Sequence, residues 1–290
     1  MRLLGIHSKR TVKAYNRCAS LLAPEIVLDR NISLEDCDGV FVHNTLQHPK
    51  TNKPVIMYLC SGSAMSVYRK GQCREWLKEN PLAALWVNCN SAHLKLLEHG
   101  IKSTVMYRPN IIHIPKTCTP MPKERRILWY WIENDIVFGE VEAEYVKTVA
   151  QLADVEIWVI PSKKSFLDAP NVKALGQIKM GQTLPQVHGM IRASLYPDFG
   201  RSMFDVLAHG RWVWTTGMNE PFVDSTNMEN LAASIRARLD AGEINTKGHE
   251  WIATKMNEAA LRKRWVNTAK KVLASTSPRL QSWEKSDNLM

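Results

Sequence analysis

Short apolar runs alternate with amphipathic segments twice along this chain, once on each side of a proline-rich stretch. The first series begins with a predicted strand at Arg2–His7 and ends with one at Thr104–Tyr107. The second series begins at Ile127–Ile132. Strands that alternate with helices at this spacing form mostly parallel sheets that helices cover on both faces. The sequence therefore predicts an α/β protein.

The remaining elements follow from local patterning and from capping signals. Further strands are expected at Glu25–Asp29, Val40–His43, Pro54–Leu59, Leu85–Asn88, Val155–Ile160 and Val172–Leu175. Helices are expected at Lys13–Leu22, Met65–Glu79, Ser91–His99 with Ser91 as its cap, Val141–Ala153, Thr183–Met190, Met228–Ala241 and Trp251–Ala274. Residues from Ser275 onward are expected to form a frayed tail.

The proline-rich stretch between the two series is interpreted as a connector between domains. It carries Pro109, Pro115, Pro120 and Pro122 and shows little periodicity. With 290 residues the chain is long enough for two domains. We expect one α/β domain over residues 1–115 and a second over 116–250, followed by a basic helix and a tail over 251–290.

The stretch from Ile191 to Gly217 has the pattern of a strand that leads into a helix through a small turn. A strand is expected at Ala193–Tyr196, a turn at 197–200, a helix at Ser202–His209 and a second strand at Arg211–Thr216. A helix N-terminus reached through such a glycine-containing turn presents backbone N–H groups that bind phosphate. Asp205 lies one turn inside this helix. An ordinary βαβ unit without a ligand has the same pattern, so the rest of the sequence must decide whether this helix N-terminus binds phosphate.

The charge is unevenly distributed along the chain. The net charge is +10, and residues 1–115 hold 15 Lys and Arg against 8 Asp and Glu, a net of +7. This suits a polyanionic partner, namely a nucleic acid, an acidic glycan or an anionic membrane surface, and simple solubility explains it equally well. The six cysteines show no metal-binding spacing, and no apolar run is long enough to span a membrane. We expect a soluble, cytoplasmic protein with free thiols.

Several segments resemble one enzyme family. One set of residues in the second half resembles a motif of the second domain of family-4-like (group 1) GT-B glycosyltransferases. The set comprises Asn171–Gly176, Leu184-Pro185, Phe199-Gly200, Asp205, Ala208 and Gly210. Weaker matches in the first half are Asp38–Asn44, Val55–Ser61, Trp86–Ser91 and Thr104–Asn110. The resemblance covers roughly residues 36–217 and is specific only in its second half.

This resemblance implies a two-domain enzyme with two Rossmann-like domains that face a cleft. The second domain would bind a nucleotide sugar, the first would bind the acceptor, and the last helix would cross back to the first domain. The residue matching the ribose-binding acid is Asp205, whose carboxylate can accept from two hydroxyls. Gly200, Arg201 and Ser202 would face the diphosphate and sugar. The family implies a retaining reaction with no dedicated general base, no metal and no further cofactor.

The chain departs from the family pattern at three places. The first acidic position falls on Pro197, so the catalytic carboxylate near the sugar is either shifted by one residue, to Asp198, or absent. Trp212 replaces a proline, and no cation follows the strand at Ile127–Ile132. A diphosphate leaving group needs charge compensation in a site without metal. The candidate cations are Arg201, Lys163 and Lys164, each of which could also be a solvated surface residue.

Two histidines end predicted strands in the first half. His7 ends the first strand and His43 the third, and the carboxyl ends of strands line the ligand crevice in open parallel sheets. The family places a donor- or acceptor-contacting residue at the position of His43, which is therefore a catalytic candidate. His7 is a candidate for acceptor binding. A histidine at a strand end can also be structural.

Basic residues in the first half predict where the acceptor binds. The candidates for acceptor or nucleic-acid binding are Lys9, Arg10, Arg69, Lys70 and Arg74, together with His7. Cations that alternate with aromatic residues can hold phosphates and stack on bases. The small, basic chain with its eroded signature resembles bacteriophage enzymes that glycosylate hydroxymethylated pyrimidines in DNA, which would place it in the host cytoplasm. The alternatives are a bacterial glycan or lipopolysaccharide glycosyltransferase, and a non-catalytic nucleic-acid-binding protein on a decayed GT-B scaffold.

Overall fold

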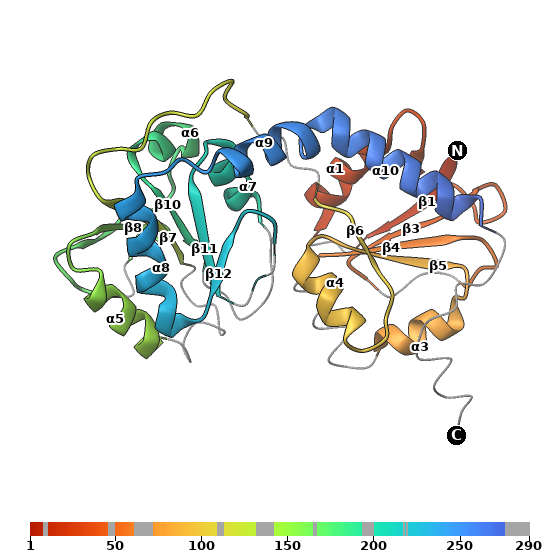
Figure 1. Cartoon of the computed structure of the whole chain (residues 1–290). Coiled ribbons are helices and arrows are strands. Elements are labelled where there is room, and N and C mark those ends of the chain that lie inside the picture. Colours follow the sequence, from red (N-terminus) through yellow and green to blue (C-terminus); the bar gives the residue numbers. More distant parts are fainter. Residues whose placement is uncertain are drawn as a thin grey trace. The chain divides into compact units, whose positions relative to one another are not determined.

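The protein, described from a computed structural model, divides into two compact units (Figure 1). Unit 1 comprises Met1–Ile111 and Glu258–Met290, and unit 2 comprises Ile112–Asn257. The structure describes residues 1–7, 11–45, 50–60, 72–108, 113–131, 142–164, 167–192, 200–216, 218 and 220–275. Each unit contains a six-stranded sheet in which every strand pair is parallel. The α/β class predicted from the alternating pattern is thereby confirmed.

The sheet of unit 1 has the strand order β2-β1-β3-β4-β5-β6. Its strands are β1 (Arg2–His7), β2 (Val27–Asp29), β3 (Gly39–His43), β4 (Val55–Leu59), β5 (Ala83–Val87) and β6 (Thr104–Val105). Every residue of β3, β4 and β5 is buried, as expected for central strands that are covered on both faces.

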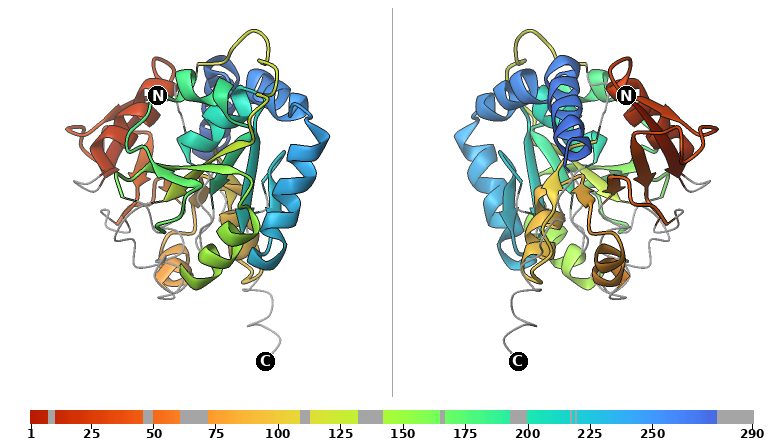
Figure 2. Two further views of the ribbon diagram at one scale, coloured as in Figure 1. Left: turned by 90° about the vertical axis from the view of Figure 1, so that its left-hand side faces the viewer. Right: turned by 90° about the vertical axis from the view of Figure 1, so that its right-hand side faces the viewer.

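In the described part of unit 1, the helices that cover the sheet are α1 (Val12–Leu22), α3 (Gln72–Glu79), α4 (Asn90–Leu97) and α10 (Glu258–Leu273). Helices α1 and α10 pack on each other on one face of the sheet, and α3 and α4 lie on the other (Figures 1 and 2). Trp265 of α10 is fully buried, and its ring lies 5.0 Å from that of Tyr58 and 5.5 Å from that of Trp86. The last described helix is therefore part of the core of unit 1.

The sheet of unit 2 has the strand order β12-β11-β10-β7-β8-β9. Its strands are β7 (Arg126–Trp131), β8 (Glu156–Pro161), β9 (Val172–Ala174), β10 (Gly189–Arg192), β11 (Trp212–Thr216) and β12 (Asp224–Thr226). Its helices are α5 (Glu142–Gln151), α6 (Met180–Thr183), the 3₁₀ helix η3 (Leu184–Gln186), α7 (Arg201–Ala208), α8 (Met228–Ala241) and α9 (Thr246–Lys255). Helices α5 and α8 share one face, where Trp129, Ile191 and Trp214 meet α8 residues in one apolar cluster.

Arg211, between α7 and β11, is a fully buried cation with several hydrogen-bond acceptors. Its guanidinium donates to the carbonyl oxygens of Leu184, Thr119 and Pro120 at 2.9–3.0 Å and to the Thr119 hydroxyl at 2.6 Å. Burial lowers the pKa of Arg211 from its ordinary value. The side chain therefore ties the end of the proline-rich stretch to η3 and to the start of β11.

Three predicted helices were placed wrongly. The segment expected to form a helix at Thr183–Met190 instead contains the end of α6, η3 and the first residues of β10. The strand expected at Ala193–Tyr196 lies outside the described residues. Helix α4 begins at Asn90, one residue before Ser91, with Cys89 at the cap position, so Ser91 lies within the first turn and is buried. The helix expected over 251–274 is two helices, α9 and α10, that are separated at Met256 and Asn257.

No described helix is long and apolar enough to span a membrane.

Candidate functional site

Each sheet contains one point at which its strand order reverses. In unit 1 the order reverses between β1 and β3, and in unit 2 it reverses between β7 and β10. Ligands of open α/β sheets bind outside the carboxyl ends of the strands at such switch points. The residues that follow or end these four strands are therefore the first candidates for a site.

The N-terminus of α7 lies in the connection from β10 to β11, at the carboxyl side of the unit 2 sheet. Gly200 is its N-cap, with φ −81° and ψ 167°, and has no side chain that could bond the first N–H groups. Those groups, on Arg201 and Ser202, have no acceptor within the helix. The Arg201 side chain is 55% exposed. The predicted residues Gly200, Arg201 and Ser202 thus form one helix terminus with donors available to an anion.

Asp205 follows one turn later on α7 and is mostly buried, with its side chain 13% exposed. Its Oδ2 lies 3.6 Å from Nε of Arg201. Burial raises the pKa of Asp205, and the Arg201 guanidinium offsets part of that rise. The carboxylate is largely shielded from water, and Arg201 is the one cation described beside it, at a distance longer than a hydrogen bond. Its oxygens can therefore still accept hydrogen bonds from a ligand.

Arg192 ends β10 at the switch point of unit 2, and the sequence analysis did not identify it. It is 9% exposed, and its guanidinium lies 4.2 Å from the centre of the Tyr130 ring on the neighbouring strand β7. Its Nη1 has no hydrogen-bond partner in the part of the chain that the structure describes. The sequence pattern predicted a helix up to Met190, so Arg192 could not be recognised as a residue of strand β10.

The two lysines predicted as diphosphate cations follow β8, one strand away from the switch point. Both are exposed. The backbone N–H of Lys164 donates to the Ser162 hydroxyl, and Gly176 leaves room for the aliphatic part of Lys163. Lys163 and Lys164 therefore lie at the carboxyl side of the sheet, and nothing described brings them into contact with Arg201 or Asp205.

His7 and His43 lie side by side at the switch point of unit 1. They are register partners at the ends of β1 and β3. His43 is fully buried, its ring lies 5.5 Å from that of Tyr58, and neither ring nitrogen has a hydrogen-bond partner among the described residues. The ring of Tyr15 lies 4.5 Å from that of His7. The structure thus brings the two predicted histidines together in an aromatic setting.

Burial, and to a lesser extent the neighbouring charges of Arg108 and His7, lowers the pKa of His43 to about 4. The folded protein therefore binds a proton at His43 less readily than the unfolded chain, whose histidines titrate near pH 6.5. The contribution to stability is complete above about pH 6.5 and is lost as the pH falls toward 4.

We expect the free energy of unfolding to fall over this window through the binding of about one extra proton by the unfolded chain. Urea unfolding of the wild type and of His43→Gln at pH 7 and pH 5 measures this contribution, since all other groups titrate in both proteins. The variant should lose less stability on acidification. Equal losses in the two proteins would contradict the assignment.

The remaining predicted residues stay untested as a site. The Arg74 guanidinium donates to the carbonyl oxygen of His99 at 2.9 Å, which ties α3 to the end of α4. Outside the described residues lie Lys9, Arg10, Arg69, Lys70 and Asp198. Within the described residues no group of three or more His, Cys, Asp and Glu side chains could hold a metal ion.

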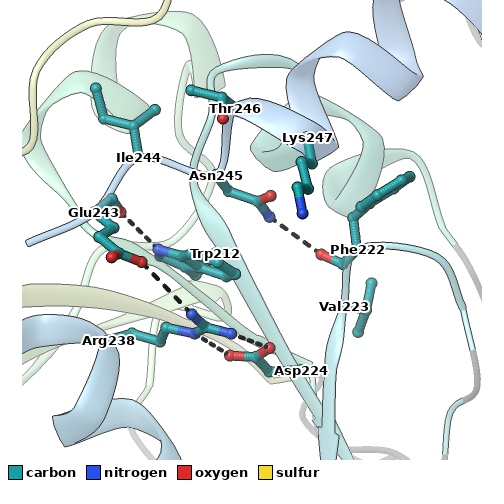
Figure 3. Close-up of a pocket in the computed structure, with 10 residues that line it drawn as sticks. All are labelled: Trp212, Phe222, Val223, Asp224, Arg238, Glu243, Ile244, Asn245, Thr246 and Lys247. Atoms are coloured by element: carbon teal, nitrogen blue, oxygen red, sulfur yellow. Dashed lines mark hydrogen bonds and ion pairs between the residues drawn. The ribbon is translucent and has the colours of Figure 1, made fainter. Parts of the chain in front are cut away.

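A cavity of about 370 Å³ lies at the opposite, amino side of the unit 2 sheet, beside the first residues of β11 and β12 (Figure 3). There the Arg238 guanidinium lies 3.7 Å from the centre of the Trp212 ring and bonds Asp224 at 2.8 and 3.1 Å. Trp212 also donates from Nε1 to the Glu243 carbonyl oxygen. The tryptophan that departs from the family pattern thus has a structural role far from the α7 terminus.

The motif at Asn171–Gly176 also has a structural role. The Asn171 amide donates to the carbonyl oxygens of Leu152 and Val155 at 3.0 and 3.1 Å, which fixes the turn before β8. Gly176 adopts φ +69°, a conformation that favours glycine. These contacts explain both residues by the fold of the β8–β9 region alone.

Comparison with known proteins yields structural matches only, since no protein-family model and no curated protein matches the chain. A sucrose-phosphate synthase from Thermosynechococcus elongatus is 11% identical, with a TM-score of 0.60 over 94% of this chain and 100% of that one. A glycosyltransferase from Rickettsia africae is 11% identical, with a TM-score of 0.59 over 94% and 99%.

A further match is a variant of TarM from S. aureus in complex with fondaparinux, α-GlcNAc-glycerol and UDP. It is 15% identical, with a TM-score of 0.55 over 81% of this chain. The match covers 55% of the TarM chain, so this chain spans about half the length of TarM. At these identities the likeness concerns the fold. With its two parallel six-stranded α/β units, the chain has the GT-B fold of these glycosyltransferases.

Proposed function

We propose that the protein is a glycosyltransferase that moves a sugar from a nucleotide-sugar donor to a hydroxyl group. The observation that carries this proposal is the position of Asp205. A mostly buried carboxylate lies one turn inside a helix whose glycine-capped N-terminus is at the carboxyl side of the unit 2 sheet. The resemblance implies a nucleotide sugar at such a terminus, and the GT-B fold supports this proposal.

The donor would be held by two kinds of group on α7. The free N–H groups at its N-terminus and the positive end of the helix dipole would face the diphosphate. The Asp205 carboxylate would accept from the ribose hydroxyls, which a single carboxylate can do with both oxygens. TarM was solved with UDP, so uridine nucleotides are the first donors to test.

The reaction we propose is retaining and needs neither a metal nor a dedicated general base. The departing diphosphate oxygen would take the proton of the acceptor hydroxyl while the sugar carbon exchanges one oxygen for the other. His43, neutral at ordinary pH because burial lowers its pKa to about 4, would donate or accept a hydrogen bond at the sugar or the acceptor. Asp198 remains the candidate for a carboxylate near the sugar.

For the acceptor we propose a hydroxymethylated pyrimidine in DNA, and the charge on α1 and α10 supports this choice. Helix α10 carries Arg262, Lys263, Arg264, Lys270 and Lys271 against one acid, Glu258, and α1 carries Lys13 and Arg17 with no acid. The two helices pack side by side, and Arg262 bonds Glu25 just beyond α1. We call this surface the α1–α10 face.

The α1–α10 face fits a nucleic acid better than a membrane. Lys13, Lys263, Lys270 and Lys271 are exposed, and in the described part of the chain none of them has an ion-pair partner. Of the large apolar side chains on the described helices α1 and α10, only Val12 is exposed, at 37%. A membrane-surface helix usually inserts larger apolar residues, whereas phosphodiester contacts need only cations and polar donors.

The double variant Lys270→Gln/Lys271→Gln should weaken binding to duplex DNA about five- to tenfold at low salt. It should also reduce the slope of log affinity against log salt by about 2, because two phosphate contacts are lost. Fluorescence anisotropy with a labelled duplex across a salt series measures both quantities.

A matched control removes the same charge from unit 2. Lys147→Gln/Lys173→Gln alters two exposed lysines, 68% and 66% exposed, on α5 and β9. If both double variants lose affinity equally, binding follows net charge and not the α1–α10 face. Tighter binding to anionic vesicles than to DNA, with the same loss in the α10 variant, would favour a membrane acceptor.

The decisive experiment for the function is mass spectrometry of hydroxymethylated DNA after incubation with UDP-, GDP- and ADP-sugars, with glycan acceptors as controls. A mass increase of one sugar on the DNA supports the proposal in full. Transfer to a glycan alone keeps the glycosyltransferase and removes the DNA acceptor. Tight, salt-dependent DNA binding with no binding of any nucleotide sugar would leave a non-catalytic binding protein on a GT-B scaffold.

A further inference from the structure

A donor diphosphate needs a cation, and the positions where the sequence suggested one do not supply a buried one. The strand β7 is followed by no basic residue up to Asp135, and Lys163 and Lys164 are exposed beyond β8. Arg201 is 55% exposed and pairs with Asp205. An exposed side chain stabilises a developing charge far less than one fixed in a site from which water is excluded.

Arg192 occupies the place where such a cation is required. It is the last residue of β10, and β10 pairs with β7 at the switch point of the unit 2 sheet. Ile191 belongs to the apolar cluster shared with α5 and α8, and successive strand residues alternate between faces. Arg192 therefore points to the other face of the sheet, the face on which α7 packs against β10 and β11.

The side chain of Arg192 is also held in place while part of its guanidinium remains available. It is 9% exposed and its guanidinium lies 4.2 Å from the centre of the Tyr130 ring. Its Nη1 lacks a hydrogen-bond partner among the described residues. A buried charged donor without an acceptor is costly, and buried polar groups usually have a hydrogen-bond partner, so the Nη1 group is a candidate to bind a ligand.

Other arginines of unit 2 lack this combination. The buried Arg211 donates to four oxygen acceptors. Arg126 at the start of β7 also stacks on a ring, 5.3 Å from the centre of Trp158, and its Nε bonds Glu156 at 2.6 Å. The guanidinium groups of these arginines are bonded to other parts of the protein, whereas Arg192 is held by stacking on Tyr130 and its Nη1 has no hydrogen-bond partner among the described residues.

We propose that Arg192 binds the diphosphate of the donor and replaces the cation that the resemblance predicts after β7. This inference rests on the proposed function and adds a residue to it. The planar guanidinium can bond two phosphate oxygens at once, and stacking on Tyr130 fixes its plane in advance. Together with the N–H groups of α7 it would stabilise the charge that develops when the sugar–phosphate bond breaks.

Calorimetric titration of Arg192→Met with UDP, pyrophosphate and uridine tests the proposal. The variant keeps the apolar stem of the side chain but removes the guanidinium, and with it the charge, the donors and the stacking on Tyr130. We expect about ten- to hundredfold weaker binding of UDP and pyrophosphate, and unchanged binding of uridine, which has no phosphate. Arg192→Lys should fall between the two, because it restores the charge without the planar fork.

Arg126→Met is the matched control, because it removes an arginine stacked on a ring at the opposite end of the neighbouring strand. It should bind all three probes like the wild type. Thermal unfolding followed by circular dichroism checks each variant for folding, and Arg192→Lys decides the question if Arg192→Met does not fold.

Two adverse results have different meanings. If the wild type transfers sugar and the Arg192 variants bind UDP and pyrophosphate as tightly as the wild type does, the role of Arg192 is overturned. The proposed function is then unaffected. A wild type that binds no nucleotide diphosphate and transfers no sugar overturns the proposed function, and this inference with it. Parallel losses for uridine and UDP would also count against Arg192 as a phosphate ligand, since they indicate a general distortion of the site.

Discussion

Replacing Arg211 with methionine is expected to lower the free energy of unfolding by about 2–3 kcal/mol. Methionine fills much of the same space but donates no hydrogen bond. The carbonyl oxygen of Leu184 would then lose its partner in a buried hydrogen bond. The carbonyl oxygens of Thr119 and Pro120 belong to exposed residues and would lose part-buried bonds, which water can partly replace. Each unsatisfied buried group costs about 1–3 kcal/mol. The lower cost of burying a neutral side chain offsets part of this loss.

Urea unfolding monitored by tryptophan fluorescence measures the change, with Arg236→Met as the matched control. Arg236 on α8 also donates to several acceptors, Asp154 and the Gln151 carbonyl, but its side chain is 40% exposed. Water replaces those partners in the variant, so the control should lose about 1 kcal/mol or less. If Arg211→Met loses no more stability than the control, the buried hydrogen bonds of Arg211 do not hold the end of the proline-rich stretch.

Replacing Asp205 with alanine is expected to weaken binding of the nucleotide sugar by roughly 1.5–3 kcal/mol, about ten- to 150-fold in affinity. This is the usual value of hydrogen bonds to a charged group. The effect on the fold should be small, because burial already disfavours the charged form of this carboxylate and raises its pKa. Asp205→Asn keeps one carbonyl acceptor, and we expect it to lose less affinity than the alanine variant.

Calorimetric titration with UDP-sugars measures the loss, and thermal unfolding confirms that the variants are folded. The control is Asp240→Ala, which removes a carboxylate from α8 that is 61% exposed and pairs with Arg125. It should bind the donor like the wild type. Unchanged donor affinity in a folded Asp205→Ala variant would remove Asp205 from the site.

The sequence predicted those elements best whose ends carry local chemical signals. Helix α8 has the predicted bounds, because Asn227 caps its first turn with a bond from the Asn230 N–H and Gly242 ends it at φ +61°. Strand β10 was missed because Gly189 and Met190 extended an apparent helix. In the structure a Cβ at Gly189 would collide with the carbonyl oxygen of Trp212 on β11, so glycine there serves strand packing.

The candidate site could be predicted only as far as it depends on position along the chain. Asp205 and Gly200 follow from the strand-turn-helix pattern, and His7 and His43 follow from their places at strand ends. The neutral, fully buried state of His43 depends on Tyr58 and on contacts between distant strands, which no local pattern encodes. Arg192 depends on strand order, since it meets Tyr130 only because β10 pairs with β7.

The two units differ in how the chain builds them. Unit 2 is one continuous stretch, whereas unit 1 is made of two segments separated by the whole of unit 2. The ring of Trp265, which fills the space against Tyr58 and Trp86, is among the last described parts of the chain to be synthesised. On the ribosome, unit 2 can therefore acquire all its residues before unit 1 can close its core. Until α10 is synthesised, the apolar surface of β4 and β5 that α10 covers in the folded protein stays exposed. The nascent chain of unit 1 is therefore the part that most needs protection from aggregation.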